Sequence, residues 1–184
     1  MMSEKSTTVY RFVSRAIRSK KKIWVCTHAR DRRWKNGRMT HSKLSLKSLG
    51  IALHRYKDSR SLWDNLPEGI ELLIIEEGQF FDMDLPLYIE KILNRGISVV
   101  VAGLDLTSEG FPFGSMGHIL CLADTVVKLT AICPCGKEAT RSLHRTGKSG
   151  EVEIGGEETY TPACVACWRN KGQNWNERPD RTPV

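Results

Sequence analysis

A short apolar segment that ends in two adjacent carboxylates constrains this chain more than any other feature. Residues 70–75, rich in Ile and Leu, predict a strand buried in a sheet, and Glu76 and Glu77 follow it directly. A buried carboxylate is costly unless it faces a metal ion, a ligand or a cationic partner. Because neighbouring side chains on a strand point to opposite faces, we expect Glu76 and Glu77 to address different partners. Considered alone, these residues fit a ligand site and a solvated strand end equally well.

The segments around this strand alternate between helical and extended patterns. Helices are expected over 7–19, from Asp84 to Gly96 and over 118–123, strands over 23–26, 97–102 and 125–132, a polar loop over 27–45, and a short strand with a helix between 47 and 63. The uninterrupted apolar run 97–102 is typical of a strand buried on both faces of a parallel sheet. The pattern predicts an α/β fold whose ligands bind at the carboxyl ends of the strands.

Charge is divided unevenly along the chain. Residues 1–60 hold 17 Lys and Arg against 3 Asp and Glu, a net charge of +14, whereas residues 61–184 hold 11 against 18, a net of −7. The basic third suits a polyanionic partner such as nucleotide phosphates or nucleic acid, and equally a solvated basic face. The sequence contains neither a run of eighteen apolar residues nor an apolar signal core, so we expect a soluble cytoplasmic protein without membrane association.

Four of the six cysteines form two close pairs, Cys133 with Cys135 and Cys164 with Cys167. In a chain without a secretion signal, two such pairs favour a structural zinc site over disulfides, although Cys-x-Cys is tighter than the usual spacing. The metal would clamp the ends of residues 136–163, a glycine-containing segment suited to closing over a ligand. The remaining two cysteines lie in apolar runs and are expected in the core; they are Cys26 and Cys121.

Five blocks of the sequence resemble the zinc-containing (type II) thymidine kinases in order and spacing. They are residues 75–81 (IEEGQFF), 101–105 (VAGLD), 112–114 (PFG), 127–133 (VKLTAIC) and 152–160 (VEIGGEETY). The resemblance implies a P-loop-type α/β kinase domain over residues 1–130 and a small zinc-bound lasso domain over 131–170. The remaining residues 171–184 are polar and contain proline, so we expect a disordered tail. The implied reaction transfers the γ-phosphoryl group of ATP to the 5′-hydroxyl of thymidine, giving dTMP in nucleotide salvage for DNA synthesis.

The resemblance also implies roles for individual residues. Glu77 would be the general base, Glu76 would support the Mg²⁺–phosphate end from the usual aspartate position, and Arg33 would offset charge in the transition state. The implied ATP- and Mg²⁺-binding residues are Ser3, Lys5, Ser6, Asp31, Arg33, Glu76 and Gln79. The implied thymidine-binding residues are Phe80, Leu104, Ser108, Phe113, Glu151, Glu153, Gly155 and Tyr160, and the implied zinc ligands are Cys133, Cys135, Cys164 and Cys167. Family members are commonly tetramers or dimers, so a homo-oligomer is expected.

Two departures from the family pattern stand out. The family's phosphate loop reads Gly-Pro-Met-x-Ser-Gly-Lys-[Ser/Thr], whereas this chain begins Met-Met-Ser-Glu-Lys-Ser, so the first glycine and the preceding strand are expected to be missing. Glu4 stands where a glycine precedes Lys5, and we expect it to disturb a loop whose backbone needs conformations that glycine permits. The second departure is Ser108, which replaces a phenylalanine beside the nucleoside.

Three hypotheses therefore stay open, ranked in this order. The first is a working thymidine kinase, favoured by Glu77 and the lasso segment. The second is a degenerate homologue that binds nucleoside without turnover, favoured by the altered phosphate loop. The third is a zinc-bearing nucleic-acid-binding module whose affinity falls steeply with salt. Nucleic-acid binding is the least expected, because the sequence has no basic strand interleaved with aromatics and no recognition-helix pattern.

Overall fold

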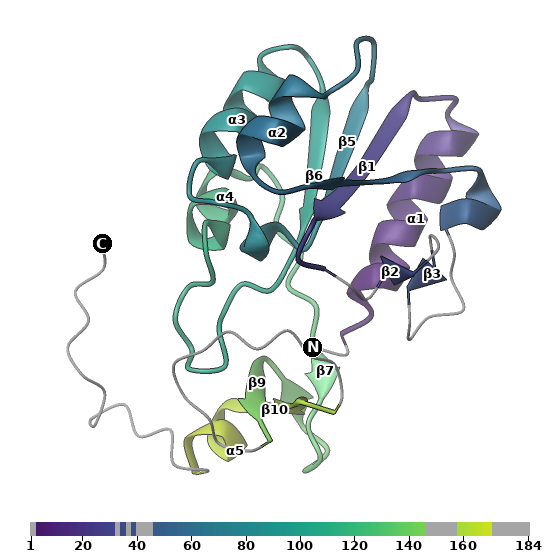
Figure 1. Cartoon of the computed structure of the whole chain (residues 1–184). Coiled ribbons are helices and arrows are strands. Elements are labelled where there is room, and N and C mark those ends of the chain that lie inside the picture. Colours follow the sequence, from purple (N-terminus) through teal and green to yellow (C-terminus); the bar gives the residue numbers. More distant parts are fainter. Residues whose placement is uncertain (1–2, 32–33, 36–37, 40–45, 146–157, 171–184) are drawn as a thin grey trace. The chain divides into compact units, whose positions relative to one another are not determined.

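The computed structural model describes residues 3–31, 34–35, 38–39, 46–145 and 158–170 (Figure 1). The chain divides into two compact units: a larger one of residues 4–105 and 112–127, and a smaller one that contains residues 106–111 and the described residues from 128 onward. Within the described residues, no helix is long and apolar enough to cross a membrane.

Four parallel strands form the sheet of the larger unit, in the order β4–β1–β5–β6 (Figure 1). They are β1 (Ile23–His28), β4 (Leu53–Tyr56), β5 (Leu72–Glu76) and β6 (Ser98–Ala102). Every residue of β5 is buried, as expected for a strand with a neighbour on each side. The α/β fold with a parallel sheet is therefore confirmed. β6 lies at one edge of this sheet, so residues 99–102 are half-buried rather than buried on both faces as their apolar run predicted.

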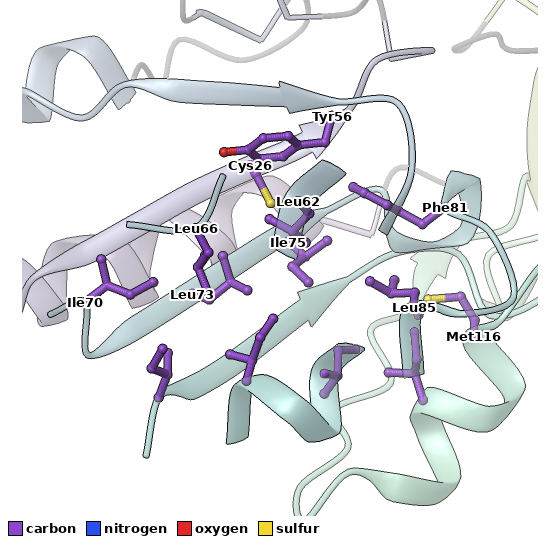
Figure 2. Close-up of a cluster of buried hydrophobic side chains, with 14 residues drawn as sticks. Cys26, Tyr56, Leu62, Leu66, Ile70, Leu73, Ile75, Phe81, Leu85 and Met116 are labelled. Atoms are coloured by element: carbon purple, nitrogen blue, oxygen red, sulfur yellow. The ribbon is translucent and has the colours of Figure 1, made fainter. Parts of the chain in front are cut away.

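Helices cover both faces of the sheet. α1 (Lys5–Arg18) packs Val9 and Val13 against one face, where they meet Leu72 and Ile74 of β5. The opposite face carries α2 (Ser59–Asp64), α3 (Leu85–Leu93) and α4 (Met116–Leu122), whose apolar side chains meet Leu73 and Ile75 (Figure 2). Residues 72–75 of β5 thus point alternately to the two faces of the sheet, because side chains alternate with a period of two along a strand. The 3₁₀ turn η2 (Gly78–Phe80) follows the carboxyl end of β5 after one residue, Glu77.

The described part of the smaller unit contains two antiparallel strand pairs and a short helix. β7 (Ala131–Ile132) pairs with β8 (Glu138–Ala139), and β9 (Arg141–His144) pairs with β10 (Tyr160–Ala163), which leads into α5 (Val165–Asn170). Trp168 of α5 is buried against Leu143 and Ala163. Its indole N–H donates a hydrogen bond of 2.9 Å to the carbonyl oxygen of Ser108, which ties residues 106–111 to this unit.

Several secondary-structure predictions need correction. A short hairpin of β2 (Trp34–Lys35) and β3 (Arg38–Met39) lies within the predicted polar loop, and η1 (Leu46–Leu49) precedes β4. Of the strand predicted over 125–132, only Ala131 and Ile132 pair, because they alone have β8 as a neighbour among the described residues. The prediction that Cys121 is a core residue is wrong: on α4 it lies away from the buried side chains of Met116 and Ile119 and is exposed. Cys26 is fully buried, as predicted.

Candidate active site

The end of β5 and the first turn of α1 bring three charged side chains together. Lys5 Nζ lies 3.2 Å from Glu76 Oε2 and also contacts Glu77 Oε1. The side chains of Glu76 and Glu77 are 0% and 1% exposed, and that of Lys5 is 18% exposed. A carboxylate pair buried at a strand end requires a cation, and this lysine supplies it.

Glu77 does not continue the strand. Its φ of 56° and ψ of 44° place it in the left-handed region, which residues with a side chain seldom adopt. The turn directs the Glu77 carboxylate toward the lysine that Glu76 also contacts, so the two acids, which we expected to address different partners, share this one. Backbone strain of this kind is concentrated at functional sites, where the surrounding structure maintains it.

The second oxygen of Glu77 has a partner from its own turn. Gln79 Nε2 donates a hydrogen bond of 2.7 Å to Glu77 Oε2. At the other end of the same carboxamide, Gln79 Oε1 accepts a hydrogen bond of 3.0 Å from the backbone N–H of Leu104, just after β6. The Glu77 carboxylate is therefore held between an ammonium group and an amide.

The end of β1 contributes buried polar residues beside this acid pair. Thr27 lies opposite Glu76 in the sheet register, is fully buried, and its hydroxyl has no hydrogen-bond partner among the described residues. Asp31 is also fully buried, and its backbone carbonyl accepts a hydrogen bond from Arg55 of β4. Thr27 was missed by the sequence reasoning, although its position at the end of an apolar strand next to β5 was an available signal.

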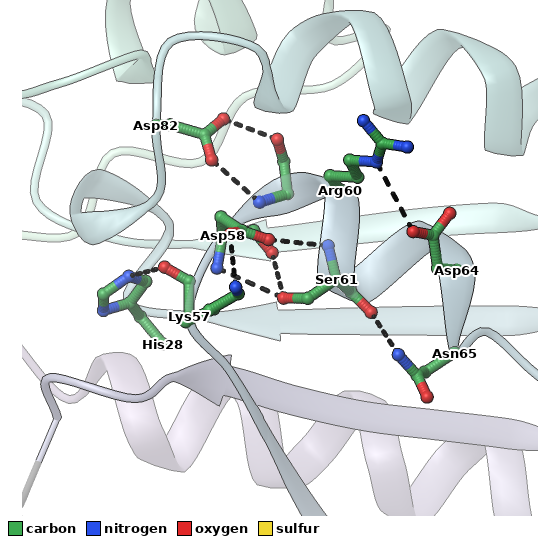
Figure 3. A network of polar contacts seen from close by, with 9 residues as sticks. His28, Lys57, Asp58, Arg60, Ser61, Asp64, Asn65 and Asp82 are labelled. Atoms are coloured by element: carbon green, nitrogen blue, oxygen red, sulfur yellow. Dashed lines mark hydrogen bonds and ion pairs between the residues drawn. The ribbon is translucent and has the colours of Figure 1, made fainter.

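His28 acts as a structural link from β1 to the segment before α2. The backbone N–H of Arg30 donates to its Nδ1 at 3.0 Å, so Nε2 carries the proton and donates to the carbonyl oxygen of Lys57 at 2.8 Å (Figure 3). The ring also meets Phe81 edge-on, with ring centroids 5.1 Å apart. His28 therefore packs the turn after β5 against β1.

A capped helix fixes the loop that follows the acid turn. Asp82 accepts hydrogen bonds from the backbone N–H of Ser59, at 2.9 Å, and from its hydroxyl (Figure 3). Ser59 begins α2, whose N-cap Asp58 accepts a 2.7 Å hydrogen bond from the N–H of Ser61. Hydrogen bonds from the backbone and hydroxyl of Ser61 lower the pKa of Asp58.

Three of the residues assigned to thymidine lie at the same end of the sheet. Phe80 and Phe113 meet edge-to-face with ring centroids 5.8 Å apart, and both are half-buried. The backbone N–H of Phe113 donates to the carbonyl oxygen of Asp105, one residue beyond Leu104, with a length of 3.0 Å. Phe80 belongs to the turn that follows Glu77, Phe113 meets its ring, and the backbone N–H of Leu104 donates to Gln79 of the same turn.

The remaining assigned residues lie elsewhere. Ser108 and Tyr160 belong to the smaller unit, where the Tyr160 ring meets His144 edge-on with centroids 5.1 Å apart. Four assigned residues lie outside the described residues: Arg33, Glu151, Glu153 and Gly155.

The start of α1 has the features of a phosphate-binding helix end. Ser3 and Ser6 are half-buried, and Lys5 and Ser6 occupy the first turn of a 14-residue helix, whose N-terminal N–H groups favour anions. Glu4 has a φ of 54° and ψ of 24°. This is a conformation that glycine adopts without strain, so the position suits the glycine that the family pattern places there.

The four paired cysteines converge in the smaller unit. The Sγ atoms of Cys133, Cys135, Cys164 and Cys167 all lie within 4.8 Å of one another. The Sγ atoms of Cys135 and Cys164 are 3.7 Å apart, close to the roughly 3.8 Å between thiolates about 2.3 Å from a tetrahedral zinc, and much longer than the roughly 2.05 Å of a disulfide.

The electrostatics of this cluster also fit a cation. Backbone N–H groups, first that of Cys135, lower the pKa of Cys133 to about 6, and the N–H of Cys167 lowers the pKa of Cys164. Hydrogen bonding with its neighbours, first Cys135, raises the pKa of Cys167 to about 12. The lowered pKa of Cys133 and of Cys164 favours their thiolate forms. Thiolates packed this closely repel one another unless a cation lies among them. The cluster could therefore hold a zinc ion.

Comparisons with known proteins show which family this chain resembles. The sequence matches the thymidine kinase family over residues 1–168. It is 36% identical over 182 residues to "Thymidine kinase, cytosolic" of Homo sapiens, in an alignment that covers 98% of this chain and 74% of the human protein. The protein of the same name from Cricetulus griseus gives the same identity and the same coverage. The chain therefore belongs to the thymidine kinase family.

Proposed function

We propose that this protein is a thymidine kinase that transfers the γ-phosphoryl group of ATP to the 5′-hydroxyl of thymidine. The observation that carries the proposal is the buried pair of Glu76 and Glu77 with Lys5, in a chain of this family. Because the chain matches thymidine kinases along almost its whole length, neither a homologue without turnover nor a nucleic-acid-binding module is the favoured hypothesis.

Glu77 is the proposed general base. Its carboxylate accepts the proton of the 5′-hydroxyl as the phosphoryl group is transferred, provided that the hydroxyl oxygen lies within hydrogen-bond reach. In the structure Lys5 occupies one of its two oxygens. An incoming phosphate would attract the ammonium group of Lys5. If the ammonium group moves toward the phosphate, the Glu77 oxygen that it contacted becomes available to the 5′-hydroxyl.

The phosphates of ATP would bind at the start of α1, with Lys5, Ser3 and Ser6 as donors. Glu76 and the Ser6 hydroxyl supply the oxygen ligands that Mg²⁺ prefers, and the metal would neutralise charge on the transferred group. Asp31, Arg33 and Gln79 complete the proposed nucleotide site.

Thymidine would contact the half-buried rings of Phe80 and Phe113, which lie edge-to-face, next to Leu104. Ser108, Glu151, Glu153, Gly155 and Tyr160 are the proposed contacts from the smaller unit. Residues 1–130 form the proposed kinase domain, residues 131–170 a lasso domain held by zinc on the four cysteines, and residues 171–184 a tail. We further propose a cytosolic homo-oligomer, as a dimer or a tetramer.

The Glu77→Gln variant tests the proposal because it keeps the size of the side chain and removes its basicity. We expect turnover of ATP with thymidine to fall by about 10²–10⁴-fold, the usual contribution of a general base. Thymidine binding, measured by calorimetry, should stay within a few-fold of the parent protein. Full turnover in Glu77→Gln would contradict the assignment of the base.

A further inference from the structure

We infer that Gln79 is a positioning residue that fixes the carboxylate of Glu77 and links it to the chain segment after β6. The inference rests on the proposed role of Glu77 as the base. It differs from the nucleotide contact proposed above, because the carboxamide of Gln79 is engaged at both ends and the residue is only 3% exposed.

The orientation of this carboxamide follows from its partners. The backbone N–H of Leu104 can only donate, so the Gln79 atom 3.0 Å from it must be the oxygen. The NH₂ group then faces Glu77 Oε2 at 2.7 Å, where an ionised carboxylate can only accept. A reversed amide would place like against like at both ends, so the network allows one orientation.

Close packing keeps Gln79 in this orientation. A Cβ atom at Gly103 would lie 2.7 Å from Gln79 Oε1 and 3.0 Å from Met116 Sδ. At Gly114, whose φ is +53°, a Cβ atom would lie 2.5 Å from the backbone oxygen of Gln79. Two glycines therefore allow the chain to close tightly around both the side chain and the backbone of Gln79.

The position of Gln79 gives it two effects on the site. Glu77 has a strained backbone and one oxygen on the ammonium group of Lys5, so Gln79 is a buried partner that would stay in place when the lysine moves toward phosphate. Through Leu104, the same amide holds the start of the segment that leads to Phe113. Gln79 thereby sets the distance between the base and the proposed nucleoside contacts.

The test is a double-mutant cycle in the full chain, with Gln79→Met and Glu77→Gln. Methionine keeps the length of the side chain and makes neither hydrogen bond. We expect Gln79→Met to lower kcat by about 10- to 100-fold, the range for residues that orient a catalytic group, while the Kd for thymidine changes less than about 3-fold. In the Glu77→Gln background, Gln79→Met should change the residual kcat by less than about 2-fold, because its action runs through Glu77.

A second variant covers the case in which Gln79→Met does not fold. Gly103→Ala keeps the Gln79 residue but pushes its side-chain oxygen away with the added methyl group. This variant should lower kcat in the parent background and leave kcat unchanged in the Glu77→Gln background. The matched control is Asn65→Leu, which removes an exposed amide that donates to the Ser61 carbonyl at 2.9 Å and should leave kcat unchanged.

Different results overturn the two proposals. Equal losses from Gln79→Met in both backgrounds, or an unchanged kcat in the parent background, would overturn the positioning role alone. Full turnover in Glu77→Gln would overturn the base assignment and the positioning role together.

Discussion

Replacing Lys5 with methionine should destabilise the protein strongly at neutral pH. The substitution leaves Glu76 and Glu77 buried, at 0% and 1% side-chain exposure, without the ammonium group that they share. Removing one member of a buried ion pair costs about 3–5 kcal/mol. The Lys5 side chain is 18% exposed, so water can partly replace it and we expect the lower end, about 3 kcal/mol. For a chain of this size, that loss corresponds to a fall in Tm of about 6–12 °C.

The loss in Lys5→Met should also depend on pH. Loss of a nearby ammonium group disfavours the ionised form of a buried carboxyl group relative to its neutral form. The penalty in the variant is therefore largest where the buried carboxyl groups are ionised, and it shrinks as falling pH protonates them. Lys5→Met should therefore be closer in stability to the parent protein at pH 5.5 than at pH 7.5.

Urea unfolding in EDTA at both pH values measures these effects. Lys21→Met is the matched control, because Lys21 is an exposed lysine just beyond α1 and its loss should change stability by less than about 0.5 kcal/mol. A loss in Lys5→Met no larger than in this control, or a loss that grows as the pH falls, would refute the reasoning.

Three further predictions concern the phosphate loop, the cysteine cluster and the α2 cap. Glu4→Gly should lower the KM for ATP severalfold by removing negative charge near the proposed phosphate site, and an unchanged KM would contradict this. The free energy of unfolding of Glu4→Gly should change little. Glycine relieves about 1–2 kcal/mol of strain in the left-handed conformation, but it also raises the conformational entropy of the unfolded chain, which costs about 0.4–1 kcal/mol. We expect one zinc ion per chain in the parent protein, measured by mass spectrometry of the metal. Cys164→Ser should lose this ion, whereas the control variant Cys121→Ser should keep it. Equal zinc content in both variants would remove Cys164 from the ligand set. Asp58→Ala should lower Tm at pH 7, and the difference in Tm from the parent should shrink as the pH falls below about 4. The reason is that the hydrogen bonds that lower the pKa of Asp58 stabilise its ionised form only. A difference that stays constant down to pH 2 would argue against the cap.

The sequence predicted the elements whose residues show a clear period. The burial of β5, the helical period of α1 and the parallel direction of the strands follow from local patterns of apolar residues. The convergence of the four cysteines was likewise predictable from two short spacings and the chemistry of thiolates. Each of these features is marked in the sequence by a short local pattern, although the contacts that form it join residues far apart in the chain.

The errors occurred where neighbours in space decide the outcome. Val126 and Val127 fit a strand pattern, yet a strand forms only where another strand accepts its hydrogen bonds. The period of two gave the wrong direction for Glu77, because the residue turns into the left-handed region at the strand end. The engagement of Gln79 with Leu104 spans 25 residues and joins the ends of two strands, so no local pattern could reveal it.

The most direct test of the central claim is phosphoryl transfer itself. The chain is incubated with Mg²⁺, thymidine and ATP labelled at the γ-phosphorus, beside the Glu77→Gln variant and a reaction with 5′-deoxythymidine, which lacks the acceptor hydroxyl. The account predicts labelled thymidine 5′-monophosphate in proportion to ADP with the parent protein, and neither product in quantity from the other two reactions. Thymidine and ATP that bind to the parent protein without forming labelled monophosphate would contradict it.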